Sequence, residues 1–174
     1  VNEVNDTFKN IISFCNTAVL NEDGNYIGDS VDVALKNYLK EDIKGNKISE
    51  MPFDSNRKMM SVVYEVDDKV MLYTKGSFES ILDKCVKVLI DDKIVKLDTK
   101  IKDSYVEIES NMAKEGLKIL AFAYKEVSNK DYNEDDLILV GLVGLKDPVR
   151  DNIKNSISEC KEAGIRPIML TGDN

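Results

Sequence analysis

The 174-residue chain has no histidine, no tryptophan and only three cysteines. Without histidine, the chain can build neither a Ser-His or Cys-His nucleophile nor a histidine-ligated metal site. The cysteines, Cys15, Cys85 and Cys160, are far apart in sequence and form no Cys-x-x-Cys pair. A disulfide framework and a zinc site are therefore not expected, and a reducing cytosol fits this cysteine usage.

Long apolar runs are also missing, and none approaches the ~20 residues that a membrane helix needs. No signal-peptide pattern occurs at Val1-Asn2-Glu3. The net charge of -8 argues against a nucleic-acid partner held by a broad basic surface. Neither a Gly-x-x-x-x-Gly-Lys-Ser/Thr loop nor a Gly-x-Gly-x-x-Gly loop is present, so any ATP site must be of another style. We expect a soluble chain without direct membrane contact.

As far as residue 146, hydrophobic periodicity predicts helices alternating with β-hairpins. Apolar residues at helical spacing predict a helix over about residues 6–19, and Asp29 or Ser30 can cap a second helix. Alternating residues on either side of Asp-Asp-Lys turns predict hairpins over 62–74 and 86–97. The other predicted elements are helices over 77–84 and 101–112 and strands over 117–127 and 137–145. Because hairpins outnumber crossovers, the predicted fold class is α+β, an antiparallel β-sheet flanked by helices.

The pattern changes at Asp147-Pro148. A helical stripe over 153–160 is followed by residues 165–170, a nearly all-apolar run that is typical of a buried parallel strand. We therefore predict a first domain over residues 1–147 and a short β-α-β piece of a second domain over 148–174. Asp147-Pro148 is the expected interdomain hinge.

One candidate binding segment begins at Phe53. Turn-forming residues and the cations Arg57 and Lys58 follow this aromatic ring, and a strand comes next. An aromatic side chain at a strand end can stack on a planar base, and nearby Lys and Arg can meet phosphates. The alternative is that Phe53 is a core residue and that the two cations lie in an exposed turn.

Three further segments carry candidate ligand-binding groups. Lys75-Gly76 lies between a strand and a helix start, where anions are favoured, although an exposed strand-end lysine is the plainer interpretation. Asp32 can bond an amino group or simply complement the helix dipole. Thr171-Gly172-Asp173 follows the apolar run, where α/β proteins place ligands, or else forms an ordinary turn.

The motifs occur in one order along nearly the whole chain: Cys15-Asn16, Gly28 to Leu35, Phe53 to Ser61, Lys75-Gly76, Gly116 to Ala121, Asp147 to Arg150, Ala163-Gly164-Ile165 and Thr171 to Asn174. The ordered set resembles the nucleotide-binding domain of P-type cation-transporting ATPases, and is most similar to the calcium-pump-like branch. The resemblance implies that residues 148–174 open a haloacid-dehalogenase-like phosphorylation domain.

The resemblance implies an adenine pocket. Phe53 looks like the ring that stacks on adenine, and Lys75, with Gly76, is similar to the lysine at the deep end of the pocket. Lys58 resembles a second pocket lysine. Asp32 stands where the family has an acid near the adenine amino group, and Leu120 would pack in the pocket.

The resemblance also implies phosphate contacts and a hinge. Lys118 occupies the position of a family arginine that contacts the nucleotide phosphates, and Ser55 replaces an arginine of the family pattern. Thr171, Gly172 and Asp173 resemble the phosphate- and nucleotide-contacting loop of the phosphorylation domain. Asp147 and Pro148 resemble the hinge to that domain.

Two family motifs are absent from this sequence, namely the phosphorylated Asp-Lys-Thr-Gly-Thr and the Gly-Asp-Gly-x-Asn-Asp whose acids hold Mg²⁺. The expected function is therefore that of a part: an ATP-binding domain on the cytoplasmic side of a cation pump. It would work with the phosphorylation domain, the actuator domain and the transmembrane helices of the same protein. With no catalytic residue and no metal ligand of its own, it would bind ATP weakly and would not turn it over.

Two alternatives remain open on the sequence alone. The chain could be the cap region of a soluble haloacid-dehalogenase-like phosphatase or kinase. It could also be a regulatory domain that keeps the fold but has lost nucleotide binding, for which Ser55 and Lys118 would be the signs.

Overall fold

The computed structural model describes residues 5–39, 43–128, 131–146 and 152–168. A seven-stranded sheet forms its centre, with the strand order β3-β4-β5-β8-β9-β6-β7. The sheet strands are β3 (Asn46–Asp54), β4 (Met59–Val66), β5 (Lys69–Gly76), β6 (Cys85–Ile90), β7 (Lys93–Lys96), β8 (Lys118–Glu126) and β9 (Leu137–Leu145). A separate small hairpin pairs β1 (Val19–Leu20) with β2 (Tyr26–Ile27).

The α+β class is confirmed, but the sheet is mixed and not purely antiparallel. β6 pairs with β9 in parallel, whereas all the other pairs in the sheet are antiparallel. From β6 the chain passes through β7, a helix and β8 before it enters β9. β9 then lies between β8, with which it is antiparallel, and β6, with which it is parallel. Two parallel strands can be joined only by a long connection of this kind, and hairpin counting along the sequence does not reveal it.

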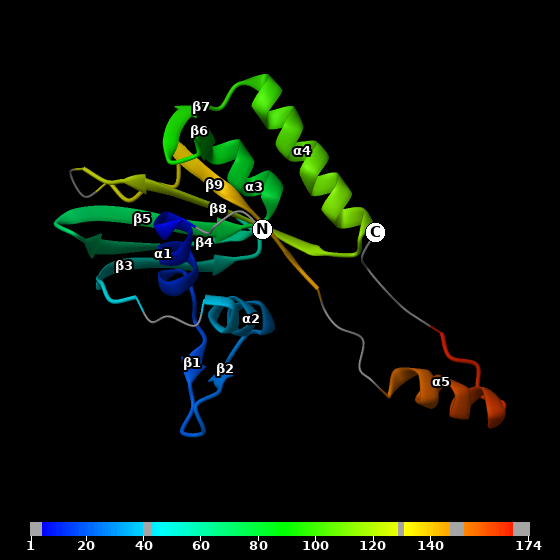
Figure 1. Ribbon diagram of the computed structural model, residues 1–174. Helices are drawn as coiled ribbons and strands as arrows, with labels where there is room; N and C mark the ends of the chain where they lie inside the picture. The colour runs from blue at the N-terminus through cyan, green and yellow to red at the C-terminus, as the bar shows by residue number, and fades with distance from the viewer. Residues whose placement is uncertain (1–4, 40–42, 129–130, 147–151, 169–174) are drawn as a thin grey trace.

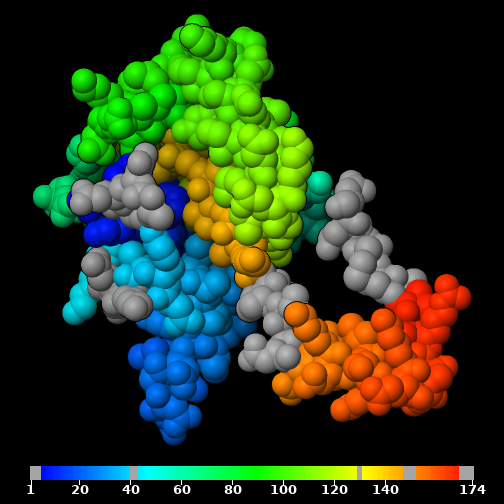
Figure 2. Space-filling model, turned by 45° about the vertical axis from the view of Figure 1, so that its right-hand side comes forward, coloured from blue at the N-terminus to red at the C-terminus, as the bar shows by residue number. Residues whose placement is uncertain are grey.

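Helices cover both faces of the sheet (Figure 1). On one face lie α3 (Phe78–Lys84) and α4 (Thr99–Lys114), and on the other lies α1 (Asp6–Phe14) with α2 (Ser30–Leu39) packed beside it. Figure 2 shows α4 lying across the edge of β9 and the β1–β2 hairpin projecting from the body of the molecule. The last helix in the described residues is α5 (Ile153–Glu162), which has no buried residue.

Two apolar clusters fill the space between the sheet and its helices. The cluster on the α3 side contains Leu72, Ile81 and Leu137, and the cluster on the α1 side contains Ile11, Leu35 and Phe122. Because side chains alternate across a strand, neighbouring residues of β4 and β5 belong to different clusters. Polar groups on consecutive residues of these strands therefore lie on opposite faces of the sheet.

Turn chemistry explains the two predicted hairpins. Asp67-Asp68 and Asp91-Asp92 all have positive φ, between 47° and 61°. A two-residue turn with both φ values positive matches the twist of the strands that it joins, and aspartate tolerates this region better than most residues. Both hairpins are confirmed, with Val66 opposite Lys69 and Ile90 opposite Lys93.

Two predicted elements differ from the structure. The first helix ends at Phe14 and not near residue 19, because Cys15 leaves the helical conformation with ψ 57°. The predicted strand over 165–170 is not found in its described part, 165–168, where Ile168 is 76% exposed. An apolar run becomes a strand only against a neighbouring strand, and no described strand pairs with it.

Candidate functional site

Sheet register brings the sequence-predicted binding residues to one end of four adjacent strands. Asp54 of β3 lies opposite Met59 of β4, and Met59 lies opposite Gly76 of β5. Gly76 in turn lies opposite Ala121 of β8, so one row crosses all four strands. The row spans about 15 Å at the usual strand spacing, roughly the length of a nucleoside with its phosphates. The candidates beside it are Phe53, Lys58, Lys75 and Leu120.

Phe53 is exposed to solvent near the end of β3, just before the β3–β4 turn. Its ring is 64% exposed, so Phe53 is not a core residue. The turn after it is fixed by Asp54, whose Oδ1 accepts hydrogen bonds of 2.9 Å from the backbone amides of Asn56 and Arg57. The Arg57 amide, followed by that of Asn56, holds the pKa of Asp54 below its usual range. A large exposed aromatic ring on an ordered turn is a surface on which a base can stack.

Lys58 closes this turn in a left-handed conformation, with φ 54°. Its amide donates to the Asp54 carbonyl at 2.7 Å, and its own carbonyl accepts from the Ser77 amide at 2.9 Å. Left-handed backbone is uncommon for a residue with a Cβ, and such positions cluster at functional sites. The lysine side chain is exposed and can reach a ligand anion.

Gly76 allows β4 and β5 to approach closely at this end of the sheet. A Cβ atom at position 76 would lie 2.6 Å from the Lys58 carbonyl oxygen and 2.6 Å from the Met59 Cβ. Real Cβ atoms do not approach other atoms so closely. Glycine at this position therefore maintains the strand spacing on which the row depends.

Lys75 and Asp32 form a buried ion pair on the α1 side of the sheet. The residues are 8% and 4% exposed, and the Lys75 Nζ donates to Asp32 Oδ1. The other oxygen, Oδ2, accepts from the backbone amide of Thr17 at 2.8 Å and from its hydroxyl at 2.7 Å. The structure thus brings together two residues that the sequence placed in one pocket, 43 positions apart.

Hydrogen bonds keep Asp32 ionised despite its burial. Desolvation raises the pKa of the carboxyl, but the hydrogen bond and charge of Lys75 and the two Thr17 contacts together outweigh it, so the pKa is lowered. Every contact that the carboxylate makes favours the charged form. Asp32 therefore does more than complement the α2 dipole, because it holds the buried Lys75 ammonium on the α1 side of the sheet.

Cys15 lies against the same pair. Its Sγ donates to the Met60 carbonyl at 3.5 Å, and burial raises its pKa to about 12. A thiol with such a pKa stays protonated and is not a nucleophile. The buried side of the candidate site thus combines one ion pair with an unreactive thiol.

A second polar network was not predicted from the sequence. Glu134, in the loop between β8 and β9, forms an ion pair with the Arg57 guanidinium and accepts from the Ser61 hydroxyl at 2.6 Å. Ser61 shares a 2.8 Å hydrogen bond with Thr74 on the adjacent strand. On the sequence alone Arg57 could either meet phosphates or lie in an exposed turn, and its guanidinium is bound to Glu134 and to the Pro52 carbonyl. The sequence separation of 77 residues leaves no local pattern that could predict this pair.

The remaining predicted site residues are placed as follows. Lys118 is exposed at the start of β8, three residues before the row at Ala121. Leu120 is half-buried and packs against the cluster on the α1 side. The hinge residues Asp147 and Pro148 and the loop residues Thr171, Gly172 and Asp173 lie outside the described residues.

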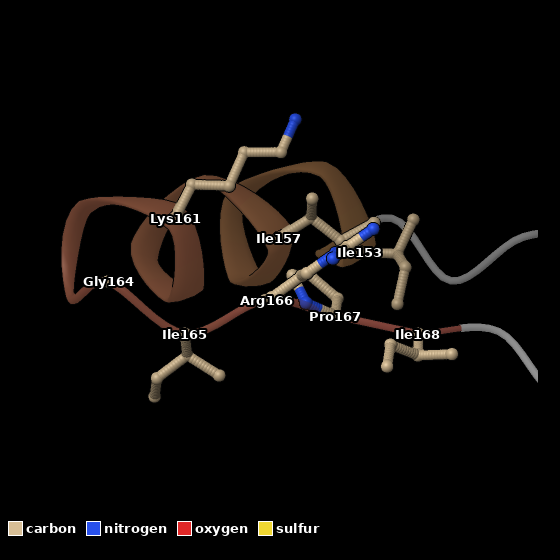
Figure 3. Close-up of a pocket in the computed structure, with 8 residues that line it drawn as sticks. All are labelled: Ile153, Ile157, Lys161, Gly164, Ile165, Arg166, Pro167 and Ile168. Carbon is tan, nitrogen blue, oxygen red and sulfur yellow. The ribbon is translucent and has the colours of Figure 1, made fainter.

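A separate hollow of about 790 Å³ lies beside α5, away from the row (Figure 3). Its lining is mainly apolar, with Ile153 and Ile157 from the helix and Ile165 and Ile168 from the segment after it. In Figure 3 the side chains of Ile153 and Ile157 extend from the helix, whereas those of Ile165 and Ile168 point away from it on the extended segment. None of the predicted binding residues lines it.

Residues 5–152 match the family described as P-type ATPase, cytoplasmic domain N. The chain belongs to the P-type ATPases. The match covers the whole sheet with its helices and all of the described candidate residues, so the fold and the candidate site belong to this N domain.

Calcium-transporting ATPases are among the relatives of this N domain. It is 38% identical to calcium-transporting ATPase 1 of Bacillus cereus, over an alignment of 174 positions that covers 92% of this chain and 19% of the relative. It is 33% identical to calcium-transporting ATPase 1 of Lactococcus lactis over 95% of this chain and 20% of the relative. It is 35% identical to calcium-transporting ATPase 1 of Saccharomyces cerevisiae, over 93% of this chain and 19% of the relative.

The chain therefore spans about a fifth of the length of these relatives. The resemblance to the calcium-pump-like branch is confirmed by these matches. In the described part of the chain, no helix combines the length and the apolar character needed to cross a membrane.

Proposed function

We propose that this N domain binds ATP by stacking adenine on Phe53, with the Lys75 ammonium below the base and Lys58 and Lys118 toward the phosphates. The observation that supports this best is the register row Asp54–Met59–Gly76–Ala121, which gathers these residues at one end of the sheet. An exposed ring on β3, exposed lysines at the starts of β4 and β8 and a buried lysine on β5, spread over about 15 Å, suit a base, a ribose and a phosphate chain. Gly76 and Leu120 form the pocket wall.

The intact protein would be an ATP-driven cation pump with this domain on its cytoplasmic side. The domain would swing about the hinge at Asp147-Pro148, where residues 148–174 open a phosphorylation domain. It would present the γ-phosphate to an aspartate that this sequence does not contain. Catalysis would then rest on positioning and charge neutralisation. The relatives named as calcium transporters favour calcium as the cargo.

Magnesium would accompany ATP in this scheme. No group of three or more acidic or cysteine side chains in the described ranges is arranged to hold a metal ion. We therefore assign the ion to the ATP phosphates and to acids elsewhere in the intact protein. This chain would bind ATP at millimolar scale, because one base stack and a few charged contacts must offset the cost of association.

A nucleotide titration tests the binding site. ATP, ADP, AMP and GTP are added to the chain while its amide resonances are followed by NMR. Shifts should concentrate at Phe53, Lys75 and Asp32. Phe53→Ala should weaken ATP binding about tenfold, because one stacked base contributes about 1–3 kcal/mol. Its thermal unfolding should be unchanged, since the ring is exposed.

Tyr38→Ala is the matched control. Tyr38 is 56% exposed on α2, so its removal deletes a comparable exposed ring away from the row. Equal binding by the wild type and Phe53→Ala, or an equal loss in Tyr38→Ala, would rule out Phe53 as the stacking residue. An acid-stable phosphorylated band on the chain after incubation with labelled ATP would contradict the absence of turnover.

A further inference from the structure

The network around Glu134 lies on the face of the sheet opposite Lys75. Ser61 and Thr74 point to the α3 side, whereas their neighbours Met60 and Lys75 point to the α1 side. Glu134 is therefore not part of the pocket that the Lys75–Asp32 pair defines. Its side chain is only 11% exposed, so an ionised carboxylate there needs partners.

One of its two partners, Arg57, holds the turn that directly follows Phe53. The guanidinium of Arg57 contacts both Glu134 and, at 2.7 Å, the carbonyl of Pro52, the residue just before Phe53. Arg57 also donates its backbone amide to Asp54, the residue just after Phe53. Arg57 thus contacts both neighbours of Phe53, Pro52 through its side chain and Asp54 through its backbone amide, and its guanidinium joins them to a loop that is far away in sequence.

The other end of the network anchors it to the centre of the sheet. Ser61 and Thr74 are both fully buried and lie opposite each other on β4 and β5. Because Thr74 directly precedes Lys75, the network links the turn at the outer strand β3 to the strand that carries the pocket lysine. A planar, forked guanidinium suits this bridging, because it can serve two acceptors in fixed directions.

We propose that Glu134 is a positioning residue for the nucleotide site, a latch that acts through Arg57 to hold Phe53 in its stacking position. This inference rests on the proposed function, because it concerns how the same ring is held. It also assigns Arg57 a role other than phosphate binding. The latch makes adenine affinity depend on a carboxylate that touches no part of the ligand.

The first test replaces Glu134 by the isosteric Glu134→Gln, which keeps the shape and removes the charge. ATP and AMP affinities should fall by the same factor, about three- to tenfold, which is no more than the loss of the stacked ring itself. Asp135→Asn is the matched control, because Asp135 lies in the same loop and pairs with exposed Lys84. This control should bind both nucleotides as the wild type does.

A double-mutant cycle separates positioning from general destabilisation. In a Phe53→Ala background, Glu134→Gln should cause no further loss of affinity, since there is no ring left to hold. Arg57→Lys, which keeps the charge but not the fork, should copy Glu134→Gln for both nucleotides. A loss for ATP that greatly exceeds the loss for AMP would instead show that Arg57 contacts phosphate and would overturn the latch.

Hydrogen exchange tests the latch without any nucleotide. The amides of Arg57 and Lys58, which donate to Asp54, should exchange about tenfold faster in Glu134→Gln than in the wild type or Asp135→Asn. If exchange accelerates but the wild type binds no adenine nucleotide, the proposed function fails while the local latch stands. If exchange and affinity are both unchanged, the latch is overturned and the binding proposal survives.

Discussion

The buried acid of α2 is the residue whose environment says most about the site. Asp32 lies in the first turn of its helix, where an acid is common and usually solvated. Here it reaches across to Thr17 and Lys75 and is nearly inaccessible. Its contacts make it the anchor of the pocket lysine, so its charge carries a stability effect that can be measured.

Asp32→Asn should destabilise the folded chain by about 3 kcal/mol near neutral pH, because it leaves the Lys75 charge buried without its partner. Asn retains most of the shape but none of the charge. Equilibrium unfolding in urea measures the difference, and Asp29→Asn, which changes an exposed acid at the same helix start, serves as the control. A change below about 0.5 kcal/mol would show that the pair contributes nothing net.

The same residue predicts a pH dependence. The pKa of Asp32 is lower in the folded chain than its ordinary value of 3.8, so its ionised form stabilises the fold above that value. As the pH falls through the folded pKa, this contribution is lost, because both states are then protonated. The wild type should lose more free energy of unfolding below about pH 4 than Asp32→Asn does. If the free energies of unfolding of the two chains changed in parallel with pH, this prediction would be contradicted.

Individual residues were predicted unevenly from the sequence. The exposed ring of Phe53 and the shared pocket of Lys75 and Asp32 came from resemblance to the P-type ATPases, since composition alone favoured a core phenylalanine. The partnership of Arg57 with Glu134 could not be predicted, because it depends on how two distant loops meet across the sheet. Local sequence carries capping and turn signals, but not contacts of that range.

At the scale of elements, Gly76 sets the spacing of the central hairpin. It lies at the end of β5 where that strand is closest to Lys58 and Met59. Gly76→Ala should cost about 2 kcal/mol of unfolding free energy, because the new methyl group must push β4 away from β5. Urea unfolding measures this cost, and displaced amide resonances from Lys58 to Ser61 should accompany it.

Gly141→Ala is its control. Gly141 also lies in a strand of the sheet, yet a Cβ there would meet nothing within 4 Å. We expect a change within about 0.5 kcal/mol, because no atom has to move. Similar costs at both positions would show that the cost at Gly76 does not come from the close approach of β4.

Elements with local signals were the ones that the sequence predicted well. Both Asp-Asp hairpins and the helix capped by Ser77 were confirmed, because their turn and cap residues specify them within a few positions. The parallel β6–β9 pair was missed because it joins strands that are 50 residues apart. The predicted strand over 165–170 was wrong in its described part, 165–168, since apolar character alone does not supply a partner strand.

At the scale of the whole molecule, both apolar clusters lie between the sheet and the helices that precede its last strand. No described residue after Leu145 belongs to either cluster, and α5 buries none of its side chains. A chain ending at Lys146 should therefore unfold within about 2 °C of the full chain, with an unchanged denaturant slope. Thermal and urea unfolding followed by circular dichroism measure both quantities.

The comparison also tests the proposed division at residue 147. A marked fall in the melting temperature on truncation would show that residues 148–174 stabilise the first domain. A second, separate unfolding transition in the full chain would show that they fold by themselves. One transition at the same temperature in both chains is the expected result.

The row across the sheet has a consequence for how such a site can be lost. β4 and β5 are joined at Asp67-Asp68, at the opposite end of the strands from Gly76. A single residue inserted into that turn would slide one strand past the other by one position and exchange the faces of Thr74 and Lys75. The ammonium would then face Glu134, and a hydroxyl would face Asp32. The length of this remote, exposed turn is therefore under the same constraint as the candidate site residues themselves.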